Sequence, residues 1–378
     1  MKPSELPTGL PRRSLLAAAA LAGAVPWIGA RAAVPLRIGQ VLPLTGPLST
    51  VVRPIAEGQR ALLDGVNAQG GVHGSAIELV TLDDAAQPAR TVEHTRTLLS
   101  DPGLVALFGY AFVPGLVQAL PLASARQVPL IGVYNGADNL RGEPTLFTTT
   151  ASLRDEVAAM VKNLAALGIR KIAVAYQDND LGRYMVPQVK SVADPADVKL
   201  TVTVALKPDG SNAGEAWKTV ATSQPQGILL LAAGAAVIGF MKAREPGARV
   251  PVYALSLAGT TSLIEQLGAA ARGMAFTQVV PYPLRQTTTL TRNFSAAMTA
   301  AKLEPTYDRM WGYLNASILV EVLRRSGPRP TPAAVSAALE RMTDVDIGGY
   351  RVAYGAQKRN GSNFVEITMV DSQGRFVR

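Results

Sequence analysis

From residue 36 onward, short apolar runs alternate with longer segments in which apolar residues recur at the helical period. This alternation is typical of strand–helix units that build a parallel sheet, so the chain is expected to fold as an α/β protein. The runs are nearly continuous in apolar residues, as a sheet covered on both faces requires. Four runs predict the strands of a first sheet, at residues 36–42, 77–82, 105–108 and 129–133.

A second series of apolar runs follows Thr150 and predicts a second sheet. Ser152 and Asp155 have the spacing of a capping box, and Gly168 is placed to end the helix that this box begins. The chain of 378 residues also exceeds what one hydrophobic core usually supports. Two doubly wound α/β lobes are therefore expected, the second with strands at 171–176, 200–204, 227–231, 252–255 and 274–279.

The N-terminus has the features of an export signal. Arg12 and Arg13 precede an apolar run over residues 15–28, and Ala30-Arg31-Ala32 forms a small-x-small cleavage pattern. The run is shorter than the roughly 20 apolar residues that span a bilayer as a helix. We expect residues 1–32 to be a signal peptide, by a twin-arginine-like or a Sec route, and the cleaved chain to be soluble in the periplasm.

Charge and composition exclude several classes of function. The formal charge is +9, yet Lys and Arg never run beyond pairs, so no nucleic-acid surface is predicted. The chain has no Cys, and His73 and His94 belong to no spaced metal cluster. No phosphate-binding loop or nucleophile elbow is present. We therefore expect no catalytic residues, no metal and no cofactor.

Several stretches carry a resemblance to a known family. They are Leu36-Arg37-Ile38-Gly39, Pro43-Leu44-Thr45-Gly46-Pro47, Asn67-Ala68-Gln69-Gly70-Gly71-Val72, Asp83-Asp84 and, at the end, Gly374-Arg375-Phe376-Val377. In order and spacing they resemble the branched-chain amino-acid binding proteins of ABC transport systems. The resemblance covers essentially the whole chain behind the signal.

The resemblance implies a type I periplasmic-binding fold, in which three crossings join two lobes and the ligand binds between them. We place the crossings near Thr149, Thr277 and Asn363. Lobe I is then expected to comprise residues 33–149 plus 278–362, and lobe II residues 150–277 plus 363–378. The implied function is the periplasmic component of an importer, which meets ABC permease subunits in the inner membrane.

Ligands of open α/β sheets bind beyond the carboxyl ends of the strands, which places the site in the loops at that edge. Members of the family hold a ligand carboxylate in the third and fourth loops of the first lobe, and its ammonium with an acid of the second. The residues predicted to bind the ligand are Tyr110, Ala111, Phe112, Tyr134, Asn135, Gly136, Leu181, Tyr184 and Ser256. For Tyr110 and Phe112, packing beneath the loop is an equal alternative.

This chain departs from the family pattern at the site. The third and fourth loops lack the usual Ser or Thr, and Ser256 stands about where the ammonium-binding acid is expected. An ammonium buried without a carboxylate would cost several kcal/mol, so another acid is needed or the ligand lacks that group. The ligand is thus an amino acid, an amide or an aromatic or aliphatic carboxylate, with candidate partners Asp138, Asp178, Asp180, Arg53, Arg141 and Arg183.

Two rival functions remain open at this point. A receptor domain of the same fold would sense a ligand and signal through a separate partner. A secreted α/β hydrolase would need a nucleophile, a base and an orienting acid, which two isolated histidines do not supply.

Overall fold

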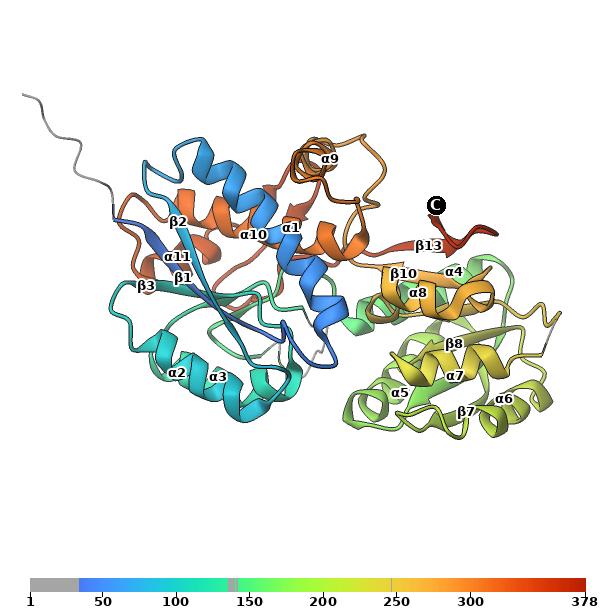
Figure 1. The fold of residues 1–378 in the computed structure, drawn as a ribbon. Coiled ribbons are helices and arrows are strands. Elements are labelled where there is room, and N and C mark those ends of the chain that lie inside the picture. Colours follow the sequence, from blue (N-terminus) through green and yellow to red (C-terminus); the bar gives the residue numbers. More distant parts are fainter. Residues whose placement is uncertain (1–33, 135–139, 141, 246) are drawn as a thin grey trace, which may run out of the picture. The chain divides into compact units, whose positions relative to one another are not determined.

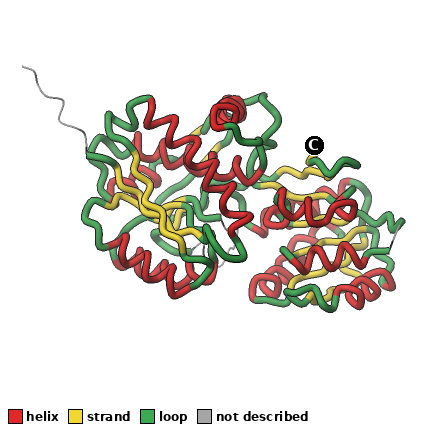
Figure 2. The backbone as a smooth tube through the Cα atoms, in the orientation of Figure 1, coloured by secondary structure: helices red, strands yellow, loops and turns green. Residues whose placement is uncertain are grey.

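A computed structural model describes residues 34–134, 140, 142–245 and 247–378. Expectations for the signal segment, and for Asn135, Gly136, Asp138 and Arg141, lie outside the described residues. The described chain contains two large sheets, each with helices on both faces, as Figures 1 and 2 show. The predicted α/β class with two parallel-sheet lobes is confirmed.

The first sheet has five parallel strands in the order β2-β1-β3-β4-β5. The four predicted strands are present, and a fifth short strand that the apolar pattern did not predict completes the edge. The strands are β1 (Leu36–Leu42), β2 (Ile77–Asp83), β3 (Leu104–Phe108), β4 (Leu130–Ile131) and β5 (Leu146–Phe147), and the helices between them are α1 (Ser49–Ala68), α2 (Pro88–Leu99) and α3 (Val113–Ala125).

The second sheet has the order β14-β13-β10-β9-β8-β6-β7, in which β13 and β14 are antiparallel additions from the C-terminus. Its strands are β6 (Lys171–Gln177), β7 (Lys199–Leu206), β8 (Gly227–Leu231), β9 (Val252–Ala254), β10 (Ala275–Gln278), β13 (Glu366–Val370) and β14 (Phe376–Val377). Its helices are α4 (Leu153–Ala166), α5 (Asp180–Ala193), α6 (Ala213–Thr222), α7 (Ala235–Ala243) and α8 (Thr261–Leu267). The predicted capping box at Ser152 and Asp155 is confirmed at the start of α4.

Alternating side chains of each central strand enter different cores, as expected for strands buried on both faces. In β3, Phe108 packs with α1 and α10 (Tyr307–Arg325), whereas Leu107 packs with α2 and α3. In β8, Leu229 packs with α4 and α5, whereas Leu230 packs with α6, α7 and α8. The remaining elements are α9 (Thr289–Ala301), α11 (Pro332–Glu340), β11 (Val345–Asp346) and β12 (Arg351–Val352).

The segments that pass between the two sheets are hydrogen-bonded to one another. Thr148 and Asn360 form a parallel bridge, and the Thr148 hydroxyl donates to Asn360 Oδ1 at 3.1 Å. The Tyr350 hydroxyl donates to the carbonyl oxygen of Thr149 at 3.0 Å and lies 3.4 Å from that of Val279. All three connections therefore meet at one place, and the exact lobe boundaries stay a prediction.

Helices α1 and α10 are in direct backbone contact beside the first sheet (Figure 1). A Cβ atom on Gly58 would lie 2.0 Å from the carbonyl oxygen of Arg309, and one on Gly312 would lie 1.9 Å from that of Ile55. Only glycine fits at either position, so this crossing fixes how closely α10 packs on the rest of the lobe.

We expect Gly58→Ala to destabilise the protein by about 3 kcal/mol or more, since a rigid backbone must move to admit the methyl group. Gly65→Ala is the matched control on the same helix, because nothing lies within 4 Å of a Cβ atom there. That change should stabilise by about 0.5–1 kcal/mol through helix propensity. Chemical denaturation of both variants measures the difference, and equal effects would contradict the close crossing.

Candidate functional site

The third loop of the first sheet, which follows β3, buries one of its predicted ligand residues and leaves two partly exposed. The Tyr110 side chain is only 1% exposed, and its hydroxyl lies 2.9 Å from Thr95 Oγ1. Burial raises the pKa of Tyr110 far above its ordinary value. Ala111 and Phe112 are partly exposed, and Phe112 is the residue before α3. Tyr110 thus packs beneath the loop, whereas Ala111 and Phe112 are accessible at the strand end.

Tyr134 follows β4 and belongs to a network of buried polar side chains. Its hydroxyl accepts a hydrogen bond from Gln59 Nε2 at 2.9 Å, and Gln59 Oε1 accepts one from Gln40 Nε2 at 3.1 Å. Burial raises the pKa of Tyr134 far above its ordinary value, so the phenol stays neutral. Gly109, at φ +67°, has no room for a Cβ atom, because Gln40 Nε2 would lie 2.5 Å away.

The network continues to the first crossing through Asn315 of α10. The Asn315 amide also bonds the Tyr134 hydroxyl, and its Nδ2 donates to the carbonyl oxygen of Gly132 at 2.7 Å. The Thr149 hydroxyl donates to Asn315 Oδ1 at 2.6 Å. A side chain at the expected ligand edge is therefore connected by hydrogen bonds to the segment that leads into the second sheet.

Trp311 lies beside Tyr134 and was not predicted as a site residue. The two rings meet edge to face, with centroids 5.5 Å apart and an interplanar angle of 67°. The indole Nε1 of Trp311 is buried and has no hydrogen-bond acceptor among the described residues. Such a donor carries a desolvation penalty unless something accepts its proton, so it is available to a ligand. A tryptophan inside an apolar helix gives no sign of this in the sequence.

The predicted second-lobe residues Leu181 and Tyr184 lie on α5. Both are partly buried and pack against the core formed with α4. The nearby charged candidates pair with one another, because Arg183 lies 2.5 Å from Asp178 and 2.9 Å from Asp180. Together the three side chains keep a net charge of −1. In the first lobe, Arg53 Nε donates to the carbonyl oxygen of Leu44 at 2.8 Å.

Ser256, two residues after β9, is hydrogen-bonded to a buried acid that the sequence did not reveal. Glu156 of α4 is 1% exposed. Its Oε2 accepts a hydrogen bond from the Ser256 N–H at 2.8 Å and another from the Thr277 hydroxyl, and its Oε1 accepts one from Ser256 Oγ at 2.9 Å. Burial raises the pKa of Glu156 above its ordinary value, and these hydrogen bonds offset only part of that rise. No cation pairs with this carboxylate among the described residues.

A second buried acid, Asp308, joins α10 to the second sheet. Its side chain is in the first turn of α10, it is 6% exposed, and its Oδ2 accepts a hydrogen bond from the Thr261 N–H at 3.4 Å. Thr261 begins α8, so the carboxylate lies at the positive end of that helix. Burial nevertheless raises the pKa of Asp308 to about 6.

We expect Asp308→Asn to stabilise the protein by up to about 3 kcal/mol at pH 7.5, because the neutral amide still accepts the Thr261 N–H without a buried charge. The folded-state pKa lies above the ordinary value of 3.8, so the folded protein binds the proton more tightly. Wild-type stability from this group is then present below pH 4 and lost as the pH rises through about 6. Urea unfolding from pH 4 to 7.5 tests this, and a gain independent of pH would contradict it.

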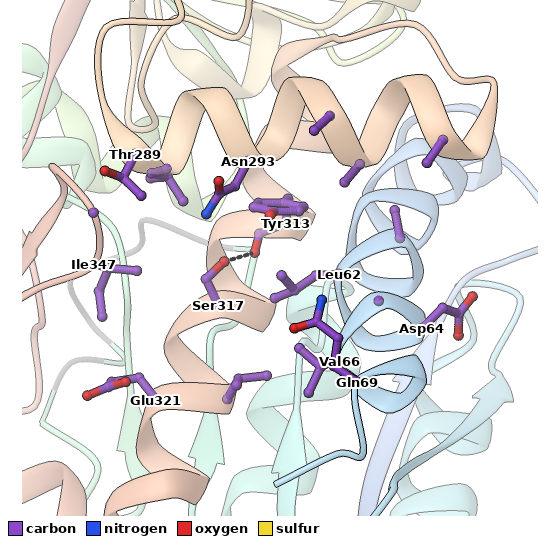
Figure 3. Close-up of a pocket in the computed structure, with 18 of the residues that line it drawn as sticks. Leu62, Asp64, Val66, Gln69, Thr289, Asn293, Tyr313, Ser317, Glu321 and Ile347 are labelled. Carbon is purple, nitrogen blue, oxygen red and sulfur yellow. Dashed lines mark hydrogen bonds between the residues drawn. The ribbon is translucent and has the colours of Figure 1, made fainter.

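A pocket with a volume of about 860 Å³ lies elsewhere (Figure 3). It is bounded by α1, α9 and α10, and Figure 3 shows Leu62, Asn293 and Tyr313 around it. None of the predicted ligand residues lines it. Because it lies among helices rather than at strand ends, we do not place the ligand there.

Within the part of the chain that the structure describes, no group of His, Asp and Glu side chains could hold a metal ion. In the same part of the chain, no helix is long and apolar enough to cross a membrane.

Comparison with known proteins places these features in context. Residues 35–375 match the family model described as periplasmic binding protein. The chain is 29% identical over 180 residues to the Leu/Ile/Val-binding protein homolog 7 of Brucella suis biovar 1 (strain 1330), which covers 45% of this chain and 44% of that relative. The matched region is therefore less than half of the relative's length.

Two solved structures resemble the whole fold. An extracellular ligand-binding receptor from Verminephrobacter eiseniae ef01-2 has a TM-score of 0.81 and 26% identity, covering 91% of this chain and 100% of that one. A branched chain amino acid ABC transporter from Thermus thermophilus with bound valine has a TM-score of 0.79 and 18% identity, covering 91% and 94%. At that identity the second likeness concerns the fold alone.

Proposed function

Because this chain belongs to the periplasmic binding protein family, we propose that it binds a small molecule between its two lobes and delivers it to the permease subunits of an ABC importer. The family is one of substrate-binding proteins rather than enzymes. The observation that carries the proposal is the hydrogen-bonded network from Tyr134 to Thr149, which joins a ligand-edge loop to a crossing. A ligand held at that loop would favour one arrangement of the lobes.

The proposed ligand is an amino acid, an amide or an aromatic or aliphatic carboxylate. In the first lobe, Phe112, Tyr134 and Trp311 offer aromatic surface, and the free indole N–H offers one donor to an oxygen of the ligand. In the second lobe, the residues proposed to contact the ligand are Leu181, Tyr184 and Ser256. The name of the Brucella suis relative favours an aliphatic amino acid among these classes.

We further propose that lobe I comprises residues 33–149 plus 278–362, and lobe II residues 150–277 plus 363–378. The ends of the strands support these limits to within a few residues, since β5 ends at Phe147, β10 at Gln278, one residue past the proposed limit, and β13 begins at Glu366. Export by residues 1–32 would then deliver the protein to the periplasm, where a captured ligand meets the importer.

The proposal predicts ligand-dependent stabilisation of residues 33–378. At a concentration 100 times its dissociation constant, a true ligand should add about 2.7 kcal/mol to the free energy of unfolding. A thermal-shift screen should include branched-chain and aromatic amino acids, their amides and their deaminated carboxylates, followed by calorimetry of each hit. A response from none of these would contradict the proposed ligand classes, and co-purification with a kinase instead of permease subunits would favour the receptor alternative.

Trp311→Phe tests the site itself. The change keeps an aromatic ring beside Tyr134 and removes an N–H that has no described acceptor. The smaller ring loses some packing, so stability should fall by about 1 kcal/mol. Ligand affinity should fall about tenfold if the indole donates to the ligand.

Trp217→Phe is the matched control for that experiment. Trp217 also has a buried indole nitrogen without a described partner and meets Phe240 edge to face, but it lies in the core formed by α6 and α7. Its loss should leave ligand affinity unchanged. Equal affinities for both variants and wild type would place Trp311 outside the site.

A further inference from the structure

Ser256 has no hydrogen left to give a ligand. Its N–H donates to Glu156 Oε2, and its hydroxyl, which carries a single proton, lies 2.9 Å from Glu156 Oε1. A carboxylate only accepts hydrogen bonds, so the Ser256 proton points to Glu156. What Ser256 Oγ retains is its capacity to accept a hydrogen bond.

The other hydrogen bonds to the Glu156 carboxylate fix the direction of its hydrogen bond with Ser256 Oγ. Oε2 receives the Ser256 N–H, which can only donate, and the Thr277 hydroxyl from β10. Oε1 is left for Ser256 Oγ. The carboxylate and Ser256 are both buried, so the charge behind Ser256 is weakly screened by solvent.

Glu156 differs from the other described acids near these strand ends in being buried without a cationic partner, since buried Glu366 pairs with Arg378. Asp178 and Asp180 lie before and at the start of α5, but both pair with Arg183. Asp155 is engaged in the capping box of α4. Glu156, when ionised, is therefore a buried negative group without a cation beside it at the end of β9.

We infer that Glu156 sets the ligand chemistry accepted by the second lobe: by accepting the hydrogen bond of the Ser256 hydroxyl, its carboxylate leaves Ser256 Oγ only as an acceptor for a ligand N–H or ammonium group. This inference rests on the proposed function. In this arrangement Ser256 contacts the ligand, and Glu156, hydrogen-bonded to Ser256, supplies the carboxylate that other members of the family would have at position 256 itself. A ligand carboxylate at the same place would find no donor and a negative charge at short range.

The experiment compares paired probes that differ by one amino group: leucine with isocaproate, valine with isovalerate, and phenylalanine with hydrocinnamate. Calorimetry of residues 33–378 should give a preference of about tenfold or more for the amino-bearing member of the pair that binds best, the size of one charge-assisted hydrogen bond. The ratio of the two dissociation constants is the readout, because a loss of stability alone does not change which member is preferred.

Glu156→Gln is the decisive variant. Its amide oxygen is required opposite the Ser256 N–H, so its Nε2 must face Ser256 Oγ and donate to it. Ser256 then has a proton to offer, and the preference for the amino-bearing probe should fall at least tenfold or reverse. Ser256→Ala removes the acceptor altogether and should lower the same ratio, and the double variant should lower it no further.

Thr277→Val is the matched control, because it removes a hydrogen bond to the same carboxylate but leaves Ser256 in place. It should reduce thermal stability and keep the ratio of the wild type. An unchanged ratio in Glu156→Gln and Ser256→Ala, or a wild-type preference for the deaminated probes, overturns the role of Glu156 while the proposed function stands. Binding of no member of any pair overturns the proposed amino-acid and carboxylate ligands themselves.

Discussion

The hydrogen bonds among the three crossing segments are the constraint on which the rest of the molecule depends. Two sheets built from separate stretches of chain have no strand in common, so their relation is set where the connections meet. Thr148 is bridged to Asn360, and Tyr350 holds the carbonyl oxygen of Thr149 beside that of Val279. Short connections that meet at one place are suited to a hinge, since the change in backbone angles is then confined to these segments and each lobe can move as a rigid body.

Polar side chains that are costly to bury are concentrated near this junction. Asn315 and Gln59 satisfy the Tyr134 hydroxyl, and Thr149 satisfies Asn315. Each member of such a network fixes the orientation of the next, because an unpaired buried polar atom costs roughly 1–3 kcal/mol. Trp311 is the exception beside the network, since its indole nitrogen lacks a described acceptor. Because Trp217 in the core has the same deficit, it is the position of Trp311 beside Tyr134 that makes it a candidate donor to a ligand.

Local patterns predicted most of the fold but little of the site. Continuous apolar runs identified the central strands, and the Ser152–Asp155 spacing identified the start of α4, because these signals act within a few residues. The strand Leu146–Phe147 is too short to give a pattern.

The hydrogen bonds between Glu156 and Ser256 join residues that are 100 positions apart, and they depend on how α4 packs beside β9 and β10. In the sequence alone, an acid one residue beyond a capping box is an ordinary first-turn residue. The sequence could not decide whether Tyr110 packs beneath its loop either, since only the folded chain brings its hydroxyl 2.9 Å from Thr95 Oγ1.

The two buried acids show why position, rather than residue type, decides what a charge does. Asp308 accepts a single long hydrogen bond from Thr261, so burial dominates and its proton is held to about pH 6. Glu156 is the more deeply buried of the two and accepts three hydrogen bonds. Its influence on Ser256 therefore depends on which donor faces which of its two oxygens. The first residue couples α10 to α8. The second orients the hydroxyl proton of Ser256, and through that proton the polarity that the second lobe presents at the end of β9.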